Sequence, residues 1–145
     1  MFKHILLPTD GSELAQSAVL KGLHFAKECG AKVTGLCVAP QFHVFTFDTE
    51  MLEDTRQQYV ADSRAQAQKH LSMLQKAATE EGVPCSTLVE AGDSPFEAII
   101  RVAERSGCDL ILMASHGRGG VKGVLLGSET QKVLTHTRIP VLVYR

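Results

Sequence analysis

The stretch Leu110-Ile-Leu-Met-Ala-Ser-His-Gly117 joins an apolar run to a group of small and polar residues. Four large hydrophobic residues in succession are typical of a parallel strand that is covered on both faces. The residues that follow are rich in glycine and end in Gly127-Ser128, directly before a helical pattern. Glycine allows a backbone to approach a ligand closely, and the N-terminus of a helix attracts anions. This stretch therefore predicts a buried strand that leads into a phosphate-binding loop.

The rest of the chain alternates between short apolar runs and amphipathic patterns of helical period. Ser12 and Ser94 are expected to cap two of the helices. Strands that alternate with helices predict an α/β domain with a mainly parallel sheet and right-handed crossovers. Without a repeat, a low-complexity tract or a linker, residues 1–145 are expected to form a single domain. The expected strands are 3–7, 33–38, 86–90, 109–113 and 140–144, and the expected helices are 12–29, 50–81, 95–106 and 127–134.

The composition argues against several partners and locations. The 145 residues carry a net charge of −1 and no run rich in lysine or arginine, so we expect neither a nucleic-acid nor an anionic-membrane partner. No apolar run is long enough for a membrane span and no signal peptide opens the chain, which favours a cytoplasmic location. The four cysteines form no C-x-x-C motif and lie in or beside apolar runs, as expected of reduced, buried thiols.

Two loops carry the candidate ligand-binding residues. The first is Pro8-Thr-Asp-Gly-Ser12, and the second is Ala114-Ser-His-Gly117, which is followed after nine residues by Gly127-Ser128. In an open parallel sheet, ligands bind at the carboxyl ends of the strands, at the point where the strand order reverses. The second loop is neither a Walker A motif nor a G-x-G-x-x-G turn, so the sequence predicts a phosphate loop of another kind.

Each of these residues also has a plainer interpretation. Asp10 is a common turn residue, and the glycines after Gly117 are compatible with a surface loop. Arg118 and Lys122 suit either phosphate contact or a solvated basic loop. His116 has no nucleophile and acid partner that the sequence identifies, so we assign no catalytic residue. The remaining histidines show no metal-ligand spacing, and no metal site is expected among the side chains.

Taken together, these stretches resemble the universal stress protein family. Ile5-Leu-Leu-Pro-Thr-Asp-Gly-Ser12 is similar to its first strand and loop, and Ala114-Ser-His-Gly-x9-Gly-Ser128 is similar to its nucleotide motif. The resemblance extends over the whole chain to the closing Ile139-Pro-Val-Leu-Val143. In ATP-binding members that motif usually begins with glycine, where this chain has Ala114. The resemblance implies an open, doubly wound, flavodoxin-like or Rossmann-like sheet of five parallel strands in the order 3-2-1-4-5, with helices on both faces.

The resemblance also implies a ligand and a partner. The ligand is ATP, with Asp10 at the ribose, the Val38 backbone at the adenine, and a magnesium or manganese ion bound through the phosphates. The partner is a second copy of the chain, paired through the last strand, Val141 to Val143. We expect the nucleotide site to comprise Pro8, Thr9, Asp10, Gly11, Ser12, Val38, Met113, Ala114, Ser115, His116, Gly117, Arg118, Gly127, Ser128 and Glu129.

Three functions remain open at this point. The leading hypothesis is an ATP-binding module that responds to the nucleotide in stress or signalling. A slow ATPase or adenylate-handling enzyme is the second, motivated by His116 and Asp10. A nucleotide-free, dimeric interaction module is the third, motivated by Ala114. The apolar segment from Phe42 to Phe47 suits a lid, a dimer contact or a core flap, and the sequence does not choose among these.

Overall fold

The structure is a computed structural model that describes residues 1–41, 49–118 and 125–145. Its centre is a five-stranded parallel sheet in the order β3-β2-β1-β4-β5, which confirms the predicted fold class and strand order. The strands are β1 (His4–Pro8), β2 (Lys32–Ala39), β3 (Cys85–Ala91), β4 (Leu110–Ala114) and β5 (Val141–Tyr144). The helices are α1 (Glu13–Cys29), α2 (Thr49–Glu81), α3 (Pro95–Ser106) and α4 (Ser128–His136).

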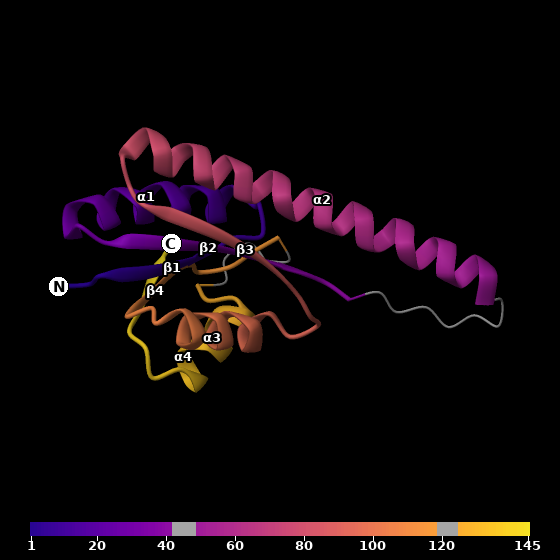
Figure 1. The fold of residues 1–145 in the computed structure, drawn as a ribbon. Helices are drawn as coiled ribbons and strands as arrows, with labels where there is room; N and C mark the ends of the chain where they lie inside the picture. Colours follow the sequence, from indigo (N-terminus) through magenta and orange to yellow (C-terminus); the bar gives the residue numbers. More distant parts are fainter. Residues whose placement is uncertain (42–48, 119–124) are drawn as a thin grey trace.

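The helices cover both faces of the sheet. Figure 1 shows α1 and α2 above the sheet and α3 and α4 below it. The side chains of β1 alternate between these layers, because successive residues of a strand point to opposite faces. Ile5 and Leu7 belong to the core on the side of α1, and Leu6 belongs to the core on the side of α3. All three are fully buried, which explains why this strand has no alternation of polar and apolar residues.

Helix α1 begins and ends where its capping residues predict. The Ser12 hydroxyl accepts a hydrogen bond of 3.3 Å from the Ala15 backbone, which satisfies one of the free N–H groups of the first turn. At the other end Gly30 adopts the left-handed conformation, with φ of 65°. Its N–H bonds back to the last turn, as is common at helix C-termini.

The predicted cap of α3 is confirmed in its position, since Ser94 is the N-cap residue and Pro95 follows it, but not in its hydrogen bond. In the part of the chain that the structure describes, the Ser94 hydroxyl makes no capping hydrogen bond. The backbone of Ser94 lies at φ −120° and ψ 85°, away from the extended geometry that Ser12 adopts. The Phe96 N–H donates instead to Glu129 Oε2 at 2.9 Å. A carboxylate from α4 thus caps the first turn of α3 and ties the two helices together.

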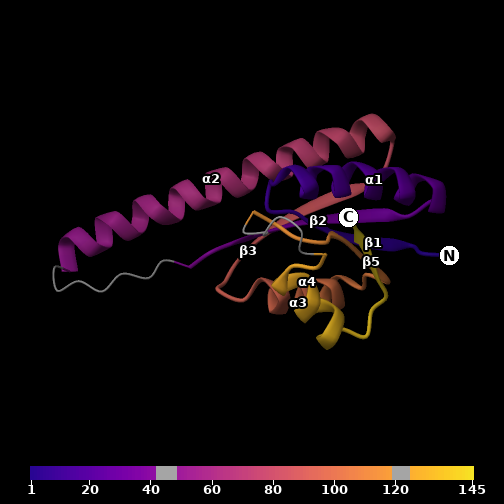
Figure 2. The same ribbon diagram turned by 180° about the vertical axis from the view of Figure 1, so that it is seen from behind.

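The buried side chains that the structure describes in helix α2 lie in its C-terminal half. The helix is 33 residues long, and its N-terminal half extends well past the sheet (Figures 1 and 2). Ala67, Leu71, Leu74 and Ala78 recur at helical spacing and are buried where the helix meets β2 and β3, as an amphipathic pattern predicts. Within the described ranges, no helix is long and apolar enough to cross a membrane.

The cysteines differ in burial but share one chemical state. All four are free; Cys37 and Cys108 are buried, as expected, whereas Cys29 and Cys85 are only half-buried. Burial raises the pKa of the Cys108 thiol to about 11 and also raises the pKa values of Cys37 and Cys85. Thiols with raised pKa values are poor nucleophiles at neutral pH. These three cysteines therefore have the properties of structural residues.

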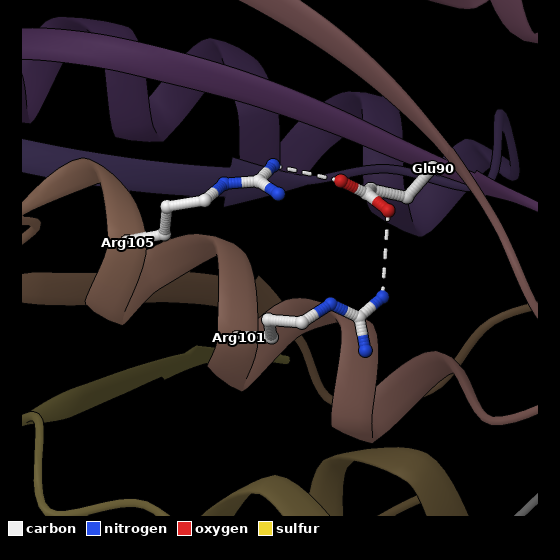
Figure 3. A network of polar contacts seen from close by, with 3 residues as sticks. All are labelled: Glu90, Arg101 and Arg105. Carbon is white, nitrogen blue, oxygen red and sulfur yellow. Dashed lines mark hydrogen bonds and ion pairs between the residues drawn. The ribbon is translucent and has the colours of Figure 1, made fainter.

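An ion-pair cluster fastens the edge strand β3 to α3. The Glu90 carboxylate lies 2.7 Å from a guanidinium nitrogen of Arg105 and 3.4 Å from one of Arg101 (Figure 3). The hydrogen bond from Arg105 is the largest influence on Glu90, and together with the hydrogen bond from Arg101 and the charges of both arginines it lowers the pKa of Glu90 against the opposing effect of burial. A carboxylate with a lowered pKa stabilises the folded state above its unfolded pKa and loses that contribution as the pH falls.

We predict that Glu90→Gln lowers the free energy of unfolding by about 0.5–1 kcal/mol at pH 7, since the arginines are solvent-exposed. The difference from the wild type should disappear below about pH 3, where Glu90 is protonated in both states. Urea denaturation at the two pH values measures it. Glu104→Gln, at an exposed position of the same helix, is the control and should cause no loss. An equal loss at both pH values would contradict the electrostatic explanation.

Candidate functional site

A cavity of about 360 Å³ opens at the carboxyl ends of β1, β2 and β4. β1 lies between β2 and β4, so the chain leaves it in one direction and later returns on its other side. This is the switch point of the sheet, where ligands of doubly wound folds bind. The two loops singled out from the sequence both reach the cavity, one after β1 and one after β4.

The carboxylate of Asp10 ties the two loops together. Asp10 Oδ1 accepts a hydrogen bond of 3.0 Å from the Ser12 N–H, within its own loop. Asp10 Oδ2 accepts one of 2.9 Å from the Arg118 N–H, across the cavity edge. Desolvation would raise the pKa of Asp10, but the hydrogen bonds from Ser12 and Arg118 and the charge of Arg118 outweigh it and lower that pKa. Asp10 is therefore an anion at neutral pH.

Gly117 is required by the closeness of this contact. A β-carbon at position 117 would collide with Asp10 Oδ2, the same oxygen that accepts the Arg118 N–H. The collision is with a group held by two hydrogen bonds, so it has little room to move aside. The close approach of the Asp10 carboxylate is therefore a structural reason for glycine at position 117, besides the predicted contact with phosphate.

The chain returns to the cavity at Gly127, the residue before α4. Its N–H donates to the Ser115 carbonyl at 2.6 Å, and a β-carbon there would lie 3.1 Å from His116 Cα. One turn into α4, the buried Thr130 hydroxyl donates to the Ala114 carbonyl at 3.0 Å. These contacts hold the first turn of α4 against the end of β4. The N-terminus of a helix, with its free N–H groups, thereby faces the cavity.

The opposite wall of the cavity is apolar. Leu36 and Val38 of β2, Ile99 of α3 and Met113 of β4 line it, all from the core layer on the side of α3. Pro95, at the start of α3, completes this wall. A cavity that combines an apolar lining with a helix N-terminus suits a ligand with an aromatic part and a charged part.

The structure gathers most of the expected site residues around one cavity. Gly11, Ser12 and Ser115 are outside the described lining: Gly11 lies under α2, Ser12 caps α1, and the buried Ser115 hydroxyl lies 3.2 Å from His116 Nδ1. Lys122 and the segment from Phe42 to Phe47 lie outside the described residues. The expected residues that line the cavity are Pro8, Thr9, Asp10, Val38, Met113, Ala114, His116, Gly117, Arg118, Gly127, Ser128 and Glu129.

Five lining residues were missed from the sequence. Two carried a usable signal: Leu36 precedes Val38 by two residues on the same face of a strand, and Ile99 lies on the apolar stripe of its helix. Pro95 suits the first position of that helix, which accounts for it without a cavity. Ala15 and Thr130 carried no signal beyond helical periodicity, and the cavity brings them together with the others.

The chain belongs to the universal stress protein family, whose sequence pattern it matches over residues 1–145. It is 31% identical over 149 residues to the universal stress protein YxiE of Bacillus subtilis, with 100% of both chains covered. The solved structure of MJ0577, a protein of Methanocaldococcus jannaschii, is 30% identical with a TM-score of 0.84, covering 99% of this chain and 96% of that one. UspA from Lactobacillus plantarum is 26% identical with a TM-score of 0.86, covering 99% and 97%.

Two further structures of this fold contain an adenine nucleotide. One is a universal stress protein in complex with cAMP, 20% identical with a TM-score of 0.72 over 99% of this chain and 97% of that one. The other is a universal stress protein from Archaeoglobus fulgidus in complex with dAMP, 15% identical with a TM-score of 0.71 over 100% and 98%. At these identities the likeness shows a shared fold.

We predict that Gly117→Ala separates Asp10 from the Arg118 backbone, because the added methyl takes the place of the carboxylate oxygen. The free energy of unfolding should fall by about 1–3 kcal/mol, as in other overpacked sites. The pKa of Asp10, measured by NMR, should rise toward its usual value as the hydrogen bond is lost. Gly92→Ala, where an added β-carbon meets nothing within 4 Å, is the matched control. Equal stability of the two variants would contradict this account of Gly117.

Proposed function

We propose that this cavity binds ATP and that the protein is a nucleotide-responsive module of stress or signalling. One observation carries the proposal: a carboxylate fixed between two loops stands at the edge of a cavity with an apolar wall and a helix N-terminus. The volume of about 360 Å³ lies within the usual range for small-molecule sites. Asp10 is suited to accept hydrogen bonds from ribose hydroxyls, because its low pKa keeps it ionised.

The apolar wall suits the adenine ring. Leu36, Val38, Ile99 and Met113 offer a surface on which a flat heterocycle can be buried, and burial of apolar area is favourable. Val38 lies near the end of β2, past the last residue that pairs with β1, Leu36, and still paired with Glu90 of β3. In the proposed complex the backbone of Val38 gives the polar edge of the adenine its hydrogen bonds.

The phosphates would meet Gly117, Gly127 and Ser128. A negative charge is favoured at the N-terminus of α4 by the helix dipole and the free N–H groups. Glu129 would oppose it, but Glu129 Oε2 accepts the Phe96 N–H and Oε1 lies 3.3 Å from Lys132 Nζ. These partners reduce the repulsion. A magnesium or manganese ion, if used, enters with the nucleotide and is held through phosphate oxygens, since Mg²⁺ commonly keeps waters and substrate ligands.

Ala114, which replaces the first glycine of the usual motif, is compatible with this proposal. It is 9% exposed and belongs to the core layer on the side of α1, together with Leu110 and Leu112. Alternation along β4 thus turns its side chain toward α1, whereas Met113 turns toward the apolar wall. The methyl group is directed largely into the core and leaves the wall that would hold adenine unchanged.

Binding is better supported than turnover. The hydrogen-bond partner that the described structure gives the His116 ring is the Ser115 hydroxyl at 3.2 Å, and a hydroxyl does not orient an imidazole as a strong general base. The cAMP and dAMP complexes show that proteins of this fold bind adenine nucleotides. These observations favour a protein that responds to the bound nucleotide over an enzyme that hydrolyses it.

We also propose a homodimer formed through β5, in the cytoplasm. β5 is an edge strand, and its Leu142 is 37% exposed. An exposed apolar edge is prone to pair with another chain, and a second copy would cover it. Four free cysteines are in keeping with a reducing compartment.

Isothermal titration with ATP in millimolar Mg²⁺ tests the proposal. The wild type should show saturable binding, and Gly127→Val should lower the affinity at least about tenfold, because its side chain would press against His116 and displace the α4 N-terminus. Sedimentation should show the same dimer for both proteins. Gly92→Val, at an unobstructed position, is the control and should bind ATP normally. Absence of saturable ATP binding by the wild type would contradict the proposed function.

A further inference from the structure

Helix α2 reaches the site through a residue that the sequence did not single out, His70. Its imidazole lies directly over Gly11, and a β-carbon on Gly11 would collide with three atoms of the ring. Gly11 also has a φ of +79°, a conformation that side chains disfavour. The loop that carries Asp10 therefore passes beneath α2 at a point where only glycine fits.

The same imidazole contacts the second loop. His70 Nε2 lies 3.3 Å from a guanidinium nitrogen of Arg118. Arginine has only donors, so Nε2 is the acceptor, and the ring is neutral with its proton on Nδ1. Burial and the charge of Arg118 lower the pKa of His70, in keeping with a neutral ring. Arg118 is thus held at two points, its N–H by Asp10 and its guanidinium by His70.

The position of this guanidinium matters for the charge of the cavity. Among the described lining residues, Arg118 is the one lysine or arginine, whereas Asp10 and Glu129 are carboxylates. A polyphosphate brings several negative charges into such a site. Its binding therefore depends on where the Arg118 charge is placed, since arginine binds phosphate through a planar fork of donors whose orientation matters.

We infer that His70 is a positioning residue, which holds the Arg118 guanidinium at the cavity for the phosphate groups of the nucleotide. The inference rests on the proposed function, because His70 acts on the same site through a residue that lines it, Arg118. It makes α2 part of the nucleotide site although α2 does not line the described cavity.

Titrations with ATP and with adenosine test the inference. His70→Ala should weaken ATP about three- to tenfold, the usual range for one hydrogen bond, and leave adenosine unchanged because adenosine has no phosphates. His70→Gln, whose side-chain oxygen can accept from Arg118, should restore most of the ATP affinity. In an Arg118→Ala background, His70→Ala should cause no further loss. His24→Ala, at an exposed position of α1, is the matched control and should bind both ligands normally.

A measurement without ligand tests the contact itself. The pKa of His70, followed by NMR, should rise in Arg118→Gln because a neighbouring positive charge is removed, while Asp10 and Lys69 remain to act on the ring. An unchanged pKa would overturn the contact. Equal weakening of ATP and adenosine in His70→Ala, or normal ATP affinity, would overturn the positioning role. A wild type that binds adenosine and ATP equally overturns the role of Arg118, whereas one that binds neither overturns the proposed function.

Discussion

The carboxylate of Asp10 connects two loops that leave the sheet from neighbouring strands. It accepts the N–H groups of Ser12 and Arg118, and the second of these bonds spans 108 residues of sequence. Around this contact the chain has little freedom, because Gly117 and Gly11 leave no space for a β-carbon. The geometry of the cavity edge depends on the hydrogen bond between the Arg118 N–H and the Asp10 carboxylate. A change at Asp10 would therefore alter both loops at once.

The parallel sheet is what brings these loops together. Because β1 and β4 run side by side in the same direction, their following loops emerge at the same edge. The helices complete the cavity: α3 adds Pro95 and Ile99 to the apolar wall that β2 and β4 begin, and α4 contributes its N-terminus. Helix α2 reaches the Arg118 side chain through His70. The Glu129 carboxylate of α4 accepts the Phe96 N–H and thereby fixes the start of α3 next to the start of α4.

The strands and helices could largely be predicted from local sequence patterns, whereas the contacts between residues far apart in the sequence could not. Apolar runs predicted the strands, and the capping residue Ser12 predicted the start of α1, because these signals act within a few residues. The order of the strands came from the family resemblance. Ser94 occupies the predicted cap position of α3, but the N–H of Phe96 is satisfied by Glu129, 33 residues along the chain, and no local pattern indicates that contact. His70 was missed because its contact with Arg118 depends on how α2 crosses the sheet.

The central claim is that the nucleotide lies in the cavity edged by Asp10 and Arg118. A crystal structure with ATP and Mg²⁺ tests it most directly. The account predicts the adenine against Val38 and Ile99, the phosphates at the N-terminus of α4, and the hydrogen bond from the Arg118 N–H to Asp10 retained. A nucleotide bound elsewhere on the molecule, or this cavity empty in the presence of saturating ATP, would contradict the account.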